Sequence, residues 1–104
     1  MINFFEKAEG FLWNKYNTDK ISEKHNVSPI ECEEAFFNEM FIEPDETHSV
    51  FEQRYKALGV TESSRLLFVV FTIRNNKIRV ISARPMSKRE RRVYDEKIKA
   101  ATKI

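Results

Sequence analysis

The stretch from residue 45 to residue 92 reads DETHSVFEQRYKALGVTESSRLLFVVFTIRNNKIRVISARPMSKRERR, and it decides the fold of this chain. Its centre, from Arg65 to Ile73, is almost continuously apolar and rich in Val and Phe. A strand of that composition needs cover on both faces. The pattern therefore predicts the central strand of a sheet.

The segment before this strand alternates in character. Within residues 51–58, Glu52, Arg54 and Lys56 fall on one side, and the opposite side carries Tyr55 and Ala57. Alternation with a period of two is typical of a strand with one buried face. A second strand is therefore predicted here, and a row of charges follows one of its faces. A solvated outer face is the simplest interpretation of that row.

The segment after the central strand predicts a hairpin. Asn75 and Asn76 separate Ile73 from a third apolar run at residues 77–84. Paired Asn residues tolerate the left-handed backbone that a two-residue hairpin turn requires. Three consecutive antiparallel strands are therefore expected. A brief fourth strand is predicted at residues 40–42, before a polar loop at 43–47, and a short edge strand at residues 11–13.

Helices are predicted from their capping residues. Caps at residues 17–19 introduce a short helix over residues 20–25 that Asn26 closes, with Ile21 as its apolar anchor. Ser28 and Glu31 form a capping box around Pro29, so a second helix should run to about Asn38. Its residues expected to pack toward the sheet are Cys32, Ala35 and Phe36.

The C-terminal segment repeats the capping-box pattern. Ser87 and Glu90 follow Pro85, and the helix that they begin should have an apolar side and a strongly cationic remainder. The predicted apolar side consists of Val93, Tyr94, Ile98 and Ala101. The order of elements predicts one α+β domain over residues 1–104. Its antiparallel sheet of three to four strands is packed on one face by the N-terminal helices and carries a basic C-terminal helix.

Composition excludes several classes of protein. With 104 residues, 41% hydrophobic and 33% charged, the chain is expected to form one soluble domain. It contains no run near the roughly 18 apolar residues of a membrane span. Its first residues lack the basic, apolar and small-residue segments, in that order, of a secretory signal. Phe4 and Phe5 in this segment are expected to be available for packing. A cytoplasmic protein is therefore expected. The single cysteine, Cys32, has no internal partner, and no ligand spacing predicts a metal or cofactor site.

Charge is unevenly distributed along the chain. Residues 74–104 hold eleven Lys or Arg against three acids, for +8, whereas residues 1–73 hold seven against thirteen, for −6, which gives the total of +2. Such asymmetry suggests a half that binds a polyanion, or else a solvated basic helix. Because the helices cover one face of the sheet, Arg54, Lys56 and Arg79 can project together from the other face. A row of cations on an open sheet suits a phosphate backbone.

Three segments, in this order, resemble the BrnT-type toxins. They are Lys24-His25-Asn26-Val27-Ser28, the His48-Ser49 to Arg54 segment with Glu52, and Ile81-Ser82-Ala83-Arg84. The resemblance covers roughly residues 11–96. It implies a RelE-like fold and a small RNA-cleaving toxin of a type II toxin–antitoxin pair that inhibits translation. It also implies neutralisation by a ribbon-helix-helix antitoxin, through which the complex contacts operator DNA.

Cleavage of RNA without a metal requires activation of the 2′-hydroxyl, stabilisation of charge on the phosphate and protonation of the leaving oxygen. Histidine is the side chain whose charge changes near neutrality, so His25 can serve as acid or base, and Glu52 is the alternative base. The predicted catalytic residues are His25, Glu52, Arg54, Arg79 and Arg84, and the predicted RNA-binding residues are Lys24, Lys56, Arg74, Lys88 and Arg89.

Alternatives stay open at this point. His25 can instead be a helix-end residue that hydrogen-bonds locally, and Arg84 can instead tie down the C-terminal helix. His48 is expected to order the loop before its strand together with Ser49, and Ser82 to be a hydrogen-bonding neighbour rather than a nucleophile. The competing function is a non-catalytic module that binds nucleic acid or an antitoxin in transcriptional regulation, and the sheet cations can serve either partner.

Overall fold

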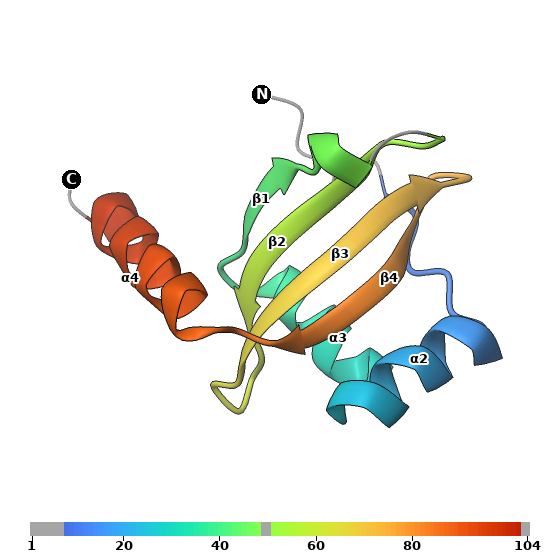
Figure 1. Cartoon of the computed structure of the whole chain (residues 1–104), viewed down its shortest axis with the longest axis horizontal. Helices are drawn as coiled ribbons and strands as arrows, with labels where there is room; N and C mark the ends of the chain where they lie inside the picture. Colours follow the sequence, from blue (N-terminus) through green and yellow to red (C-terminus); the bar gives the residue numbers. More distant parts are fainter. Residues whose placement is uncertain (1–7, 49–50, 103–104) are drawn as a thin grey trace.

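A computed structural model describes residues 8–48 and 51–102, so the expectations for Phe4, Phe5 and Ser49 lie outside the described residues. The strands form one antiparallel sheet in the order β1-β2-β3-β4 (Figure 1). They are β1 (Phe41–Pro44), β2 (Arg54–Val60), β3 (Leu66–Arg74) and β4 (Lys77–Pro85). The helices are α2 (Lys15–His25), α3 (Pro29–Phe37) and α4 (Lys88–Thr102), with a 3-10 turn η1 (Glu46–His48). The predicted α+β class and the interior position of β3 are confirmed.

The β3–β4 hairpin turns at Asn75 and Asn76, as predicted. Both residues have positive φ, 52° and 62°, which is the left-handed conformation that Asn accepts more readily than most residues. Further along the hairpin the register shifts. Val70 pairs with Ser82 but Phe71 pairs with Val80, so Ile81 is an extra residue in β4. A bulge of this kind moves every later side chain of the strand to the opposite face.

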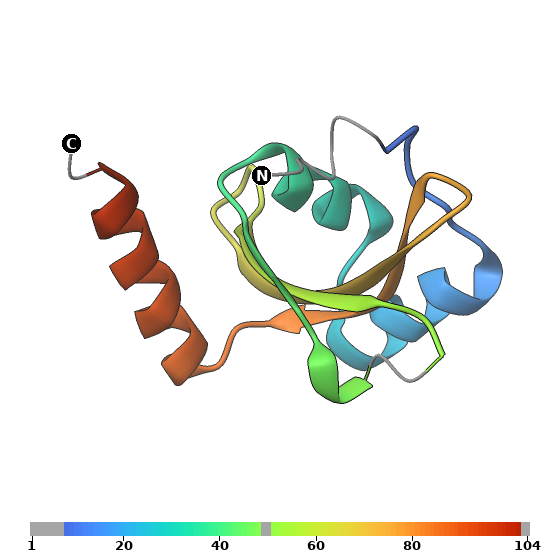
Figure 2. The ribbon, with the colours of Figure 1, turned by 90° about the horizontal axis from the view of Figure 1, so that it is seen from above.

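The core lies between the sheet and the first two helices. Ile21 on α2 and Phe36 on α3 belong to one buried cluster with Leu67, Val69 and Phe71 of β3. The rings of Phe36 and Phe71 meet edge to face with centroids 5.0 Å apart. Figure 2 shows the sheet curving around α3, with α2 alongside the β4 edge. Burial of this apolar side is the main force that holds the helices on the sheet.

The start of α2 differs from the prediction. The helix begins at Lys15 rather than Lys20, because Asn14 is its N-cap and forms a capping box with Asn17. Asn17 is almost fully buried, and its side-chain amide donates to the carbonyls of Leu12 and Val80, both at 3.2 Å. A polar residue therefore anchors the first turn of α2. Because the prediction took the N-terminal cap from residues 17–19, it missed this start of the helix. The predicted C-cap is correct, since Asn26 is left-handed with φ 52°.

The predicted strand at residues 11–13 is replaced by an isolated bridge from Phe11 to Ile78. The backbone of Ile78 donates to Gly10 and accepts from Leu12, at 2.9 and 2.8 Å, so this segment does lie along the β4 edge. The pairing ends there because Asn14 is the N-cap of α2 and the chain continues as a helix.

The other strand boundaries also shift. The predicted strand at residues 40–42 is observed as β1, which includes Glu43 and Pro44 of the predicted loop. Pro44 is tolerated because β1 is an edge strand, where a missing N–H breaks no ladder. The strand predicted at 51–58 begins only at Arg54 and extends to Val60. The extension is set by pairing, since Gly59 and Val60 lie opposite Leu67 and Leu66.

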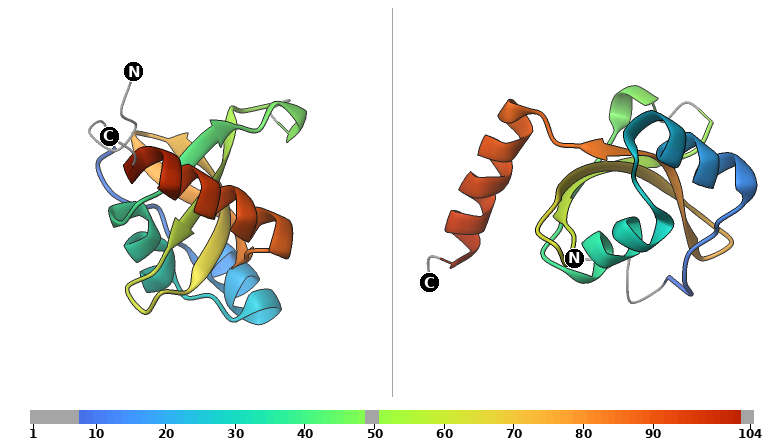
Figure 3. Two further views of the ribbon diagram at one scale, coloured as in Figure 1. Left: turned by 90° about the vertical axis from the view of Figure 1, so that its left-hand side faces the viewer. Right: turned by 90° about the horizontal axis from the view of Figure 1, so that it is seen from below.

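The helix α4 begins at the predicted capping box. The Ser87 hydroxyl accepts from the Glu90 amide, and the Glu90 carboxylate accepts from the Ser87 amide at 2.8 Å. Figure 3 shows α4 running obliquely past the end of the sheet near β1, apart from the other helices. Of its predicted apolar side, Tyr94 is buried and donates to the Glu39 carbonyl at 2.9 Å, whereas Ala101 is exposed.

Candidate functional site

The face of the sheet that points away from α3 carries the predicted cations. We call it the open face, and its strand residues form cross-strand rows because paired residues point the same way. These residues are Arg54, Lys56 and Leu58 on β2, Phe68, Val70 and Thr72 on β3, and Arg79, Ser82 and Arg84 on β4.

The central cationic row consists of Arg54, Thr72 and Arg79. Arg54 lies opposite Thr72, which in turn lies opposite Arg79. The two arginines therefore flank a small residue across three strands, with backbones about 10 Å apart at the usual strand spacing. Thr72 is buried, and its hydroxyl donates to the Gln53 carbonyl at 2.8 Å. The structure confirms that Arg54 and Arg79 share a face, and the spacing suits a phosphate held between two guanidinium groups.

Lys56 lies one row further along the open face. It pairs with Val70, which pairs with Ser82, and its ammonium group lies 3.4 Å from the Glu43 carboxylate. Lys56 therefore adds to the shared cationic surface, as predicted. Ser82 is a half-buried neighbour in the same row.

At one end of the open face, Glu52 and Arg74 form an ion pair. The Arg74 guanidinium lies 3.0 Å from one Glu52 oxygen and 3.3 Å from the other. This contact holds the predicted base beside the cationic row, two residues before Arg54. A carboxylate offers about four lone-pair sites, so the ion pair leaves Glu52 able to accept a further proton or hydrogen bond.

At the other end, Arg84 makes a two-pronged contact with the Glu90 carboxylate at 2.8 and 2.9 Å. Its guanidinium also lies 4.4 Å from the centre of the Phe68 ring. The hydrogen bond to Glu90 raises the pKa of Arg84, and the hydrogen bond from Arg84 lowers the pKa of the Glu90 carboxyl group. Arg84 therefore ties α4 to the sheet, and its position on the open face leaves its predicted role in phosphate binding as a prediction.

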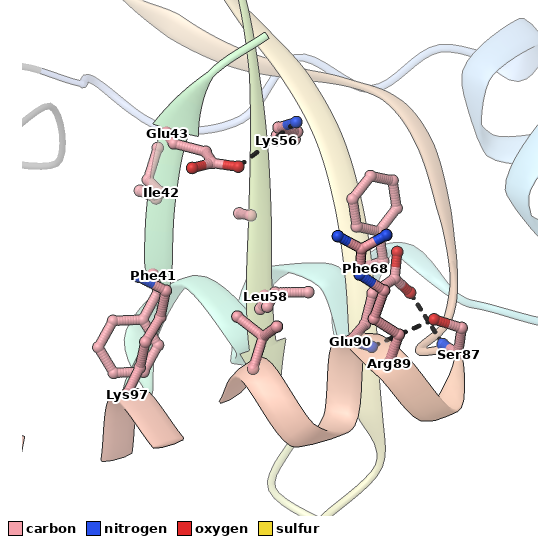
Figure 4. A pocket seen from close by; sticks show the side chains of 12 residues that line it. Phe41, Ile42, Glu43, Lys56, Leu58, Phe68, Ser87, Arg89, Glu90 and Lys97 are labelled. Atoms are coloured by element: carbon pink, nitrogen blue, oxygen red, sulfur yellow. Dashed lines mark hydrogen bonds and ion pairs between the residues drawn. The ribbon is translucent and has the colours of Figure 1, made fainter. Parts of the chain in front are cut away.

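Between α4 and the open face lies a groove of about 360 Å³ (Figure 4). Phe41, Leu58 and Phe68 line it from the strands, and Arg89 and Lys97 line it from α4. Arg89, which was predicted to bind RNA, therefore faces this groove. Its neighbour Lys88 is exposed on the first turn of the helix.

His25 and Lys24 lie apart from the cationic row. Both side chains are exposed at the C-terminal end of α2. This end is held through its backbone carbonyls, because the Arg65 guanidinium donates to those of His25 and Asn26 at 3.0 and 2.8 Å. The same guanidinium binds the Glu31 carboxylate at 3.0 Å. The sequence indicated no role for Arg65, which joins α2 and α3 to the start of β3.

A second pocket, of about 220 Å³, lies beside η1 and was not anticipated from the sequence. Its lining residues are Thr47, His48, Phe51, Glu52 and Arg54. His48 contacts Asp45 through Nδ1, which confirms that it orders this loop. The sequence contained one signal, which is the close spacing of Asp45, His48, Glu52 and Arg54 along the chain. Because β2 begins only at Arg54, these residues come together where the loop meets that strand.

Cys32 has the properties of a core residue. Burial and the neighbouring Glu31 and Glu33 carboxylates raise the pKa of its thiol to about 12. Among the residues described by the structure, no three His, Cys, Asp or Glu side chains group together as metal ligands. None of the described helices is long and apolar enough to span a membrane.

Comparison with protein families gives a match over residues 13–90 to the model described as the ribonuclease toxin, BrnT, of type II toxin–antitoxin systems. The chain belongs to the BrnT family. The matched segment contains the whole sheet and ends at Glu90, the residue that binds Arg84. BrnT toxins are ribonucleases paired with an antitoxin, so RNA is the substrate class and an antitoxin the partner. A comparison with individual curated proteins gave no match, and the assignment rests on the family model.

Proposed function

We propose that this BrnT toxin is an endoribonuclease that cleaves RNA on the open face of its sheet without a metal ion and thereby inhibits translation. The observation that carries the proposal is the Arg54–Thr72–Arg79 row, which presents two guanidinium groups on β2 and β4, on either side of β3. Arginine binds phosphate through paired N–H donors and keeps its charge at any physiological pH. The row can therefore hold the scissile phosphate and stabilise the charge that develops on it.

Glu52 is the proposed general base. It lies at the end of the open face, and its carboxylate is held by Arg74 beside the strand that carries Arg54. In the proposed reaction Glu52 takes the proton of the 2′-hydroxyl as that oxygen attacks the adjacent phosphorus. Arg54 and Arg79 then stabilise the negative charge of the resulting phosphorane.

The remaining predicted site residues act at the margins of this surface. Lys56 and Arg74 attract the RNA backbone on the open face, and Lys88 and Arg89 extend the positive surface onto α4. His25, Lys24 and Arg84 lie where β3 begins and β4 ends, with His25 and Lys24 on α2. We include His25 and Arg84 in the proposed catalytic set and test them separately.

We further propose that the antitoxin is a ribbon-helix-helix protein, encoded beside the toxin, through which the complex binds operator DNA. An acidic antitoxin segment that covers the open face would explain both inhibition and specificity, because the same cations would serve RNA and antitoxin in turn. Co-expression with a neighbouring small open reading frame of that pattern is expected to restore growth, and the two proteins are expected to purify together.

The deciding experiment incubates the purified chain with a translating cell extract and maps RNA ends. The variants Arg54→Ala and Arg79→Ala are expected to lower the cleavage rate about 10²-fold or more, by loss of charge stabilisation. Arg91→Ala is the matched control, since it removes the same charge from an exposed position on α4. Induction in cells of His25→Ala and Arg84→Ala beside the wild type tests the remaining pair.

If the wild type leaves RNA intact but binds it, the chain is a non-catalytic module that docks RNA or an antitoxin. If Arg54→Ala and Arg79→Ala cleave as fast as Arg91→Ala, the open face is not the catalytic surface.

A further inference from the structure

The pocket beside η1 combines proton-transfer groups, a cation and an exposed ring. Figures 1 and 2 show η1 on the side of the sheet away from α3, at the end of the open face where β2 begins. His48, Phe51, Glu52 and Arg54 all line this pocket. Glu52 is the proposed general base and Arg54 a proposed phosphate ligand. Because both line this pocket, the pocket is continuous with the proposed RNA site.

His48 is held in a fixed orientation by Asp45. The Nδ1 atom of His48 lies 3.0 and 3.2 Å from the two Asp45 carboxylate oxygens. Asp45 is itself buried, and its backbone amide donates to the Arg54 carbonyl at 2.8 Å, which fixes it to β2. Because Nδ1 is occupied, Nε2 is the ring atom that can exchange a proton with a substrate. The His48 side chain is 65% exposed, so substrate can reach it.

Phe51 is completely exposed, at 101% of its reference surface, on the wall of the same pocket. A single exposed apolar residue is unremarkable by itself. Beside a histidine and an arginine, however, an aromatic ring is the usual platform on which a base of single-stranded RNA stacks. The pocket thus contains a component for two parts of a nucleotide, namely the Phe51 ring for the base and Arg54 for the phosphate.

We propose that this pocket is the cleavage subsite, in which Phe51 stacks on a base of the RNA and His48 is the general acid. The proposal rests on the proposed ribonuclease function and names the residue that protonates the leaving group. The recognised chemistry is a single-stranded ribonucleotide with a free 2′-hydroxyl.

In the proposed reaction Glu52 and His48 each exchange one proton with the RNA. Glu52 accepts the 2′-hydroxyl proton as the 2′-oxygen bonds to phosphorus. The bond between phosphorus and the 5′-oxygen breaks, and that oxygen takes the Nε2 proton of the His48 imidazolium. The products are a 2′,3′-cyclic phosphate and a 5′-hydroxyl end. Solvent water then carries the proton from Glu52 back to His48, which restores both groups.

The first test compares His48→Ala with the control Arg91→Ala, using the purified full chain and RNA whose cleavage position has been mapped. Loss of a general acid is expected to slow cleavage about 10²- to 10⁴-fold. Arg91→Ala, whose side chain is exposed on α4 outside the proposed site, is expected to stay within about threefold of the wild type in this assay. Phe51→Ala is expected to raise KM at least about tenfold, since stacking contributes to binding.

The second test separates catalysis from a structural role of the loop. The mapped RNA is made with sulfur in place of the bridging 5′-oxygen, because a thiolate leaves without protonation. On this RNA His48→Ala is expected to cleave within about tenfold of the wild type, whereas a variant with a damaged loop would keep its full defect.

Three outcomes would overturn the inference. Cleavage by His48→Ala at the wild-type rate would remove the assigned role, and so would a defect that persists on the sulfur-containing RNA. If the wild type cleaves neither free nor ribosome-bound RNA, the proposed function itself fails and the inference falls with it.

Discussion

The contact between Arg84 and Glu90 should behave as an energetic link between the sheet and α4. Its two hydrogen bonds, at 2.8 and 2.9 Å, join charged groups whose side chains are 37% and 22% exposed. Hydrogen bonds to charged groups contribute about 1.5–3 kcal/mol, and exposed ion pairs about 0–1 kcal/mol. Because the pair is partly exposed, we expect its coupling free energy to lie where these two ranges approach each other, at about 1 kcal/mol.

A double-mutant cycle measures this coupling. Glu90→Gln keeps an oxygen for the Ser87 amide and removes the charge, and Arg84→Met removes the guanidinium while keeping the length of the side chain. Urea unfolding of the wild type, both single variants and the double variant can be followed by the fluorescence of Trp13, the one tryptophan in the chain. The double variant should be about 1 kcal/mol more stable than the sum of the single losses predicts.

The same coupling should depend on pH with a definite sign. The bond from Arg84 lowers the pKa of Glu90 from its ordinary value of 4.5, so the unfolded chain binds this proton more readily than the folded one. The stabilisation is therefore fully present above 4.5 and is lost as pH falls through the lowered pKa of the folded state. A coupling that is absent at pH 7, or one that persists unchanged at acidic pH, would refute this account of how α4 is attached.

Two substitutions are predicted to lower stability, and one side chain is predicted to react slowly. Gly59→Ala places a methyl group 2.8 Å from Met40 Cε, the flexible end of a side chain that can move away, and 3.2 Å from Ala35 Cβ, which must shift with α3. The overpacking should therefore cost only about 1 kcal/mol in a urea titration. Asn17→Ala leaves the carbonyls of Leu12 and Val80 without its amide and should cost about 1–3 kcal/mol, seen as a lower Tm. Cys32 should react with an alkylating reagent only as fast as the chain opens, since its thiol is buried with a pKa of about 12; rapid labelling of the folded protein would contradict this.

Local signals in the sequence predicted much of the fold. Both capping boxes, at Ser28 and at Ser87, begin helices as expected, and the Asn75-Asn76 turn and the apolar run of β3 are where the pattern placed them. Each of these signals depends on a few neighbouring residues. The start of α2 was missed because its first turn is anchored by a buried Asn17, whose partner Val80 lies 63 residues away.

The site was predicted less completely, because it depends on strand register. Arg79 and Arg84 are five residues apart, and strict alternation would place them on opposite faces of β4. The extra residue at Ile81 brings both onto the open face. Nothing in the local composition marks this bulge. The position of Glu52 beside Arg74 and of His48 beside Asp45 likewise depends on the loop between β1 and β2, which follows no repeating pattern.

The attachment of α4 has a consequence for the motions of the molecule. Among its described side chains only Tyr94 is buried, whereas β3 is flanked by strands on both sides and contributes Leu67, Val69 and Phe71 to the core. A helix of 15 residues is marginal without tertiary contacts. Amide protons of α4 should therefore exchange with solvent through local opening, long before those of β3, which need global unfolding. The floor of the groove would then be uncovered intermittently while the sheet stays intact.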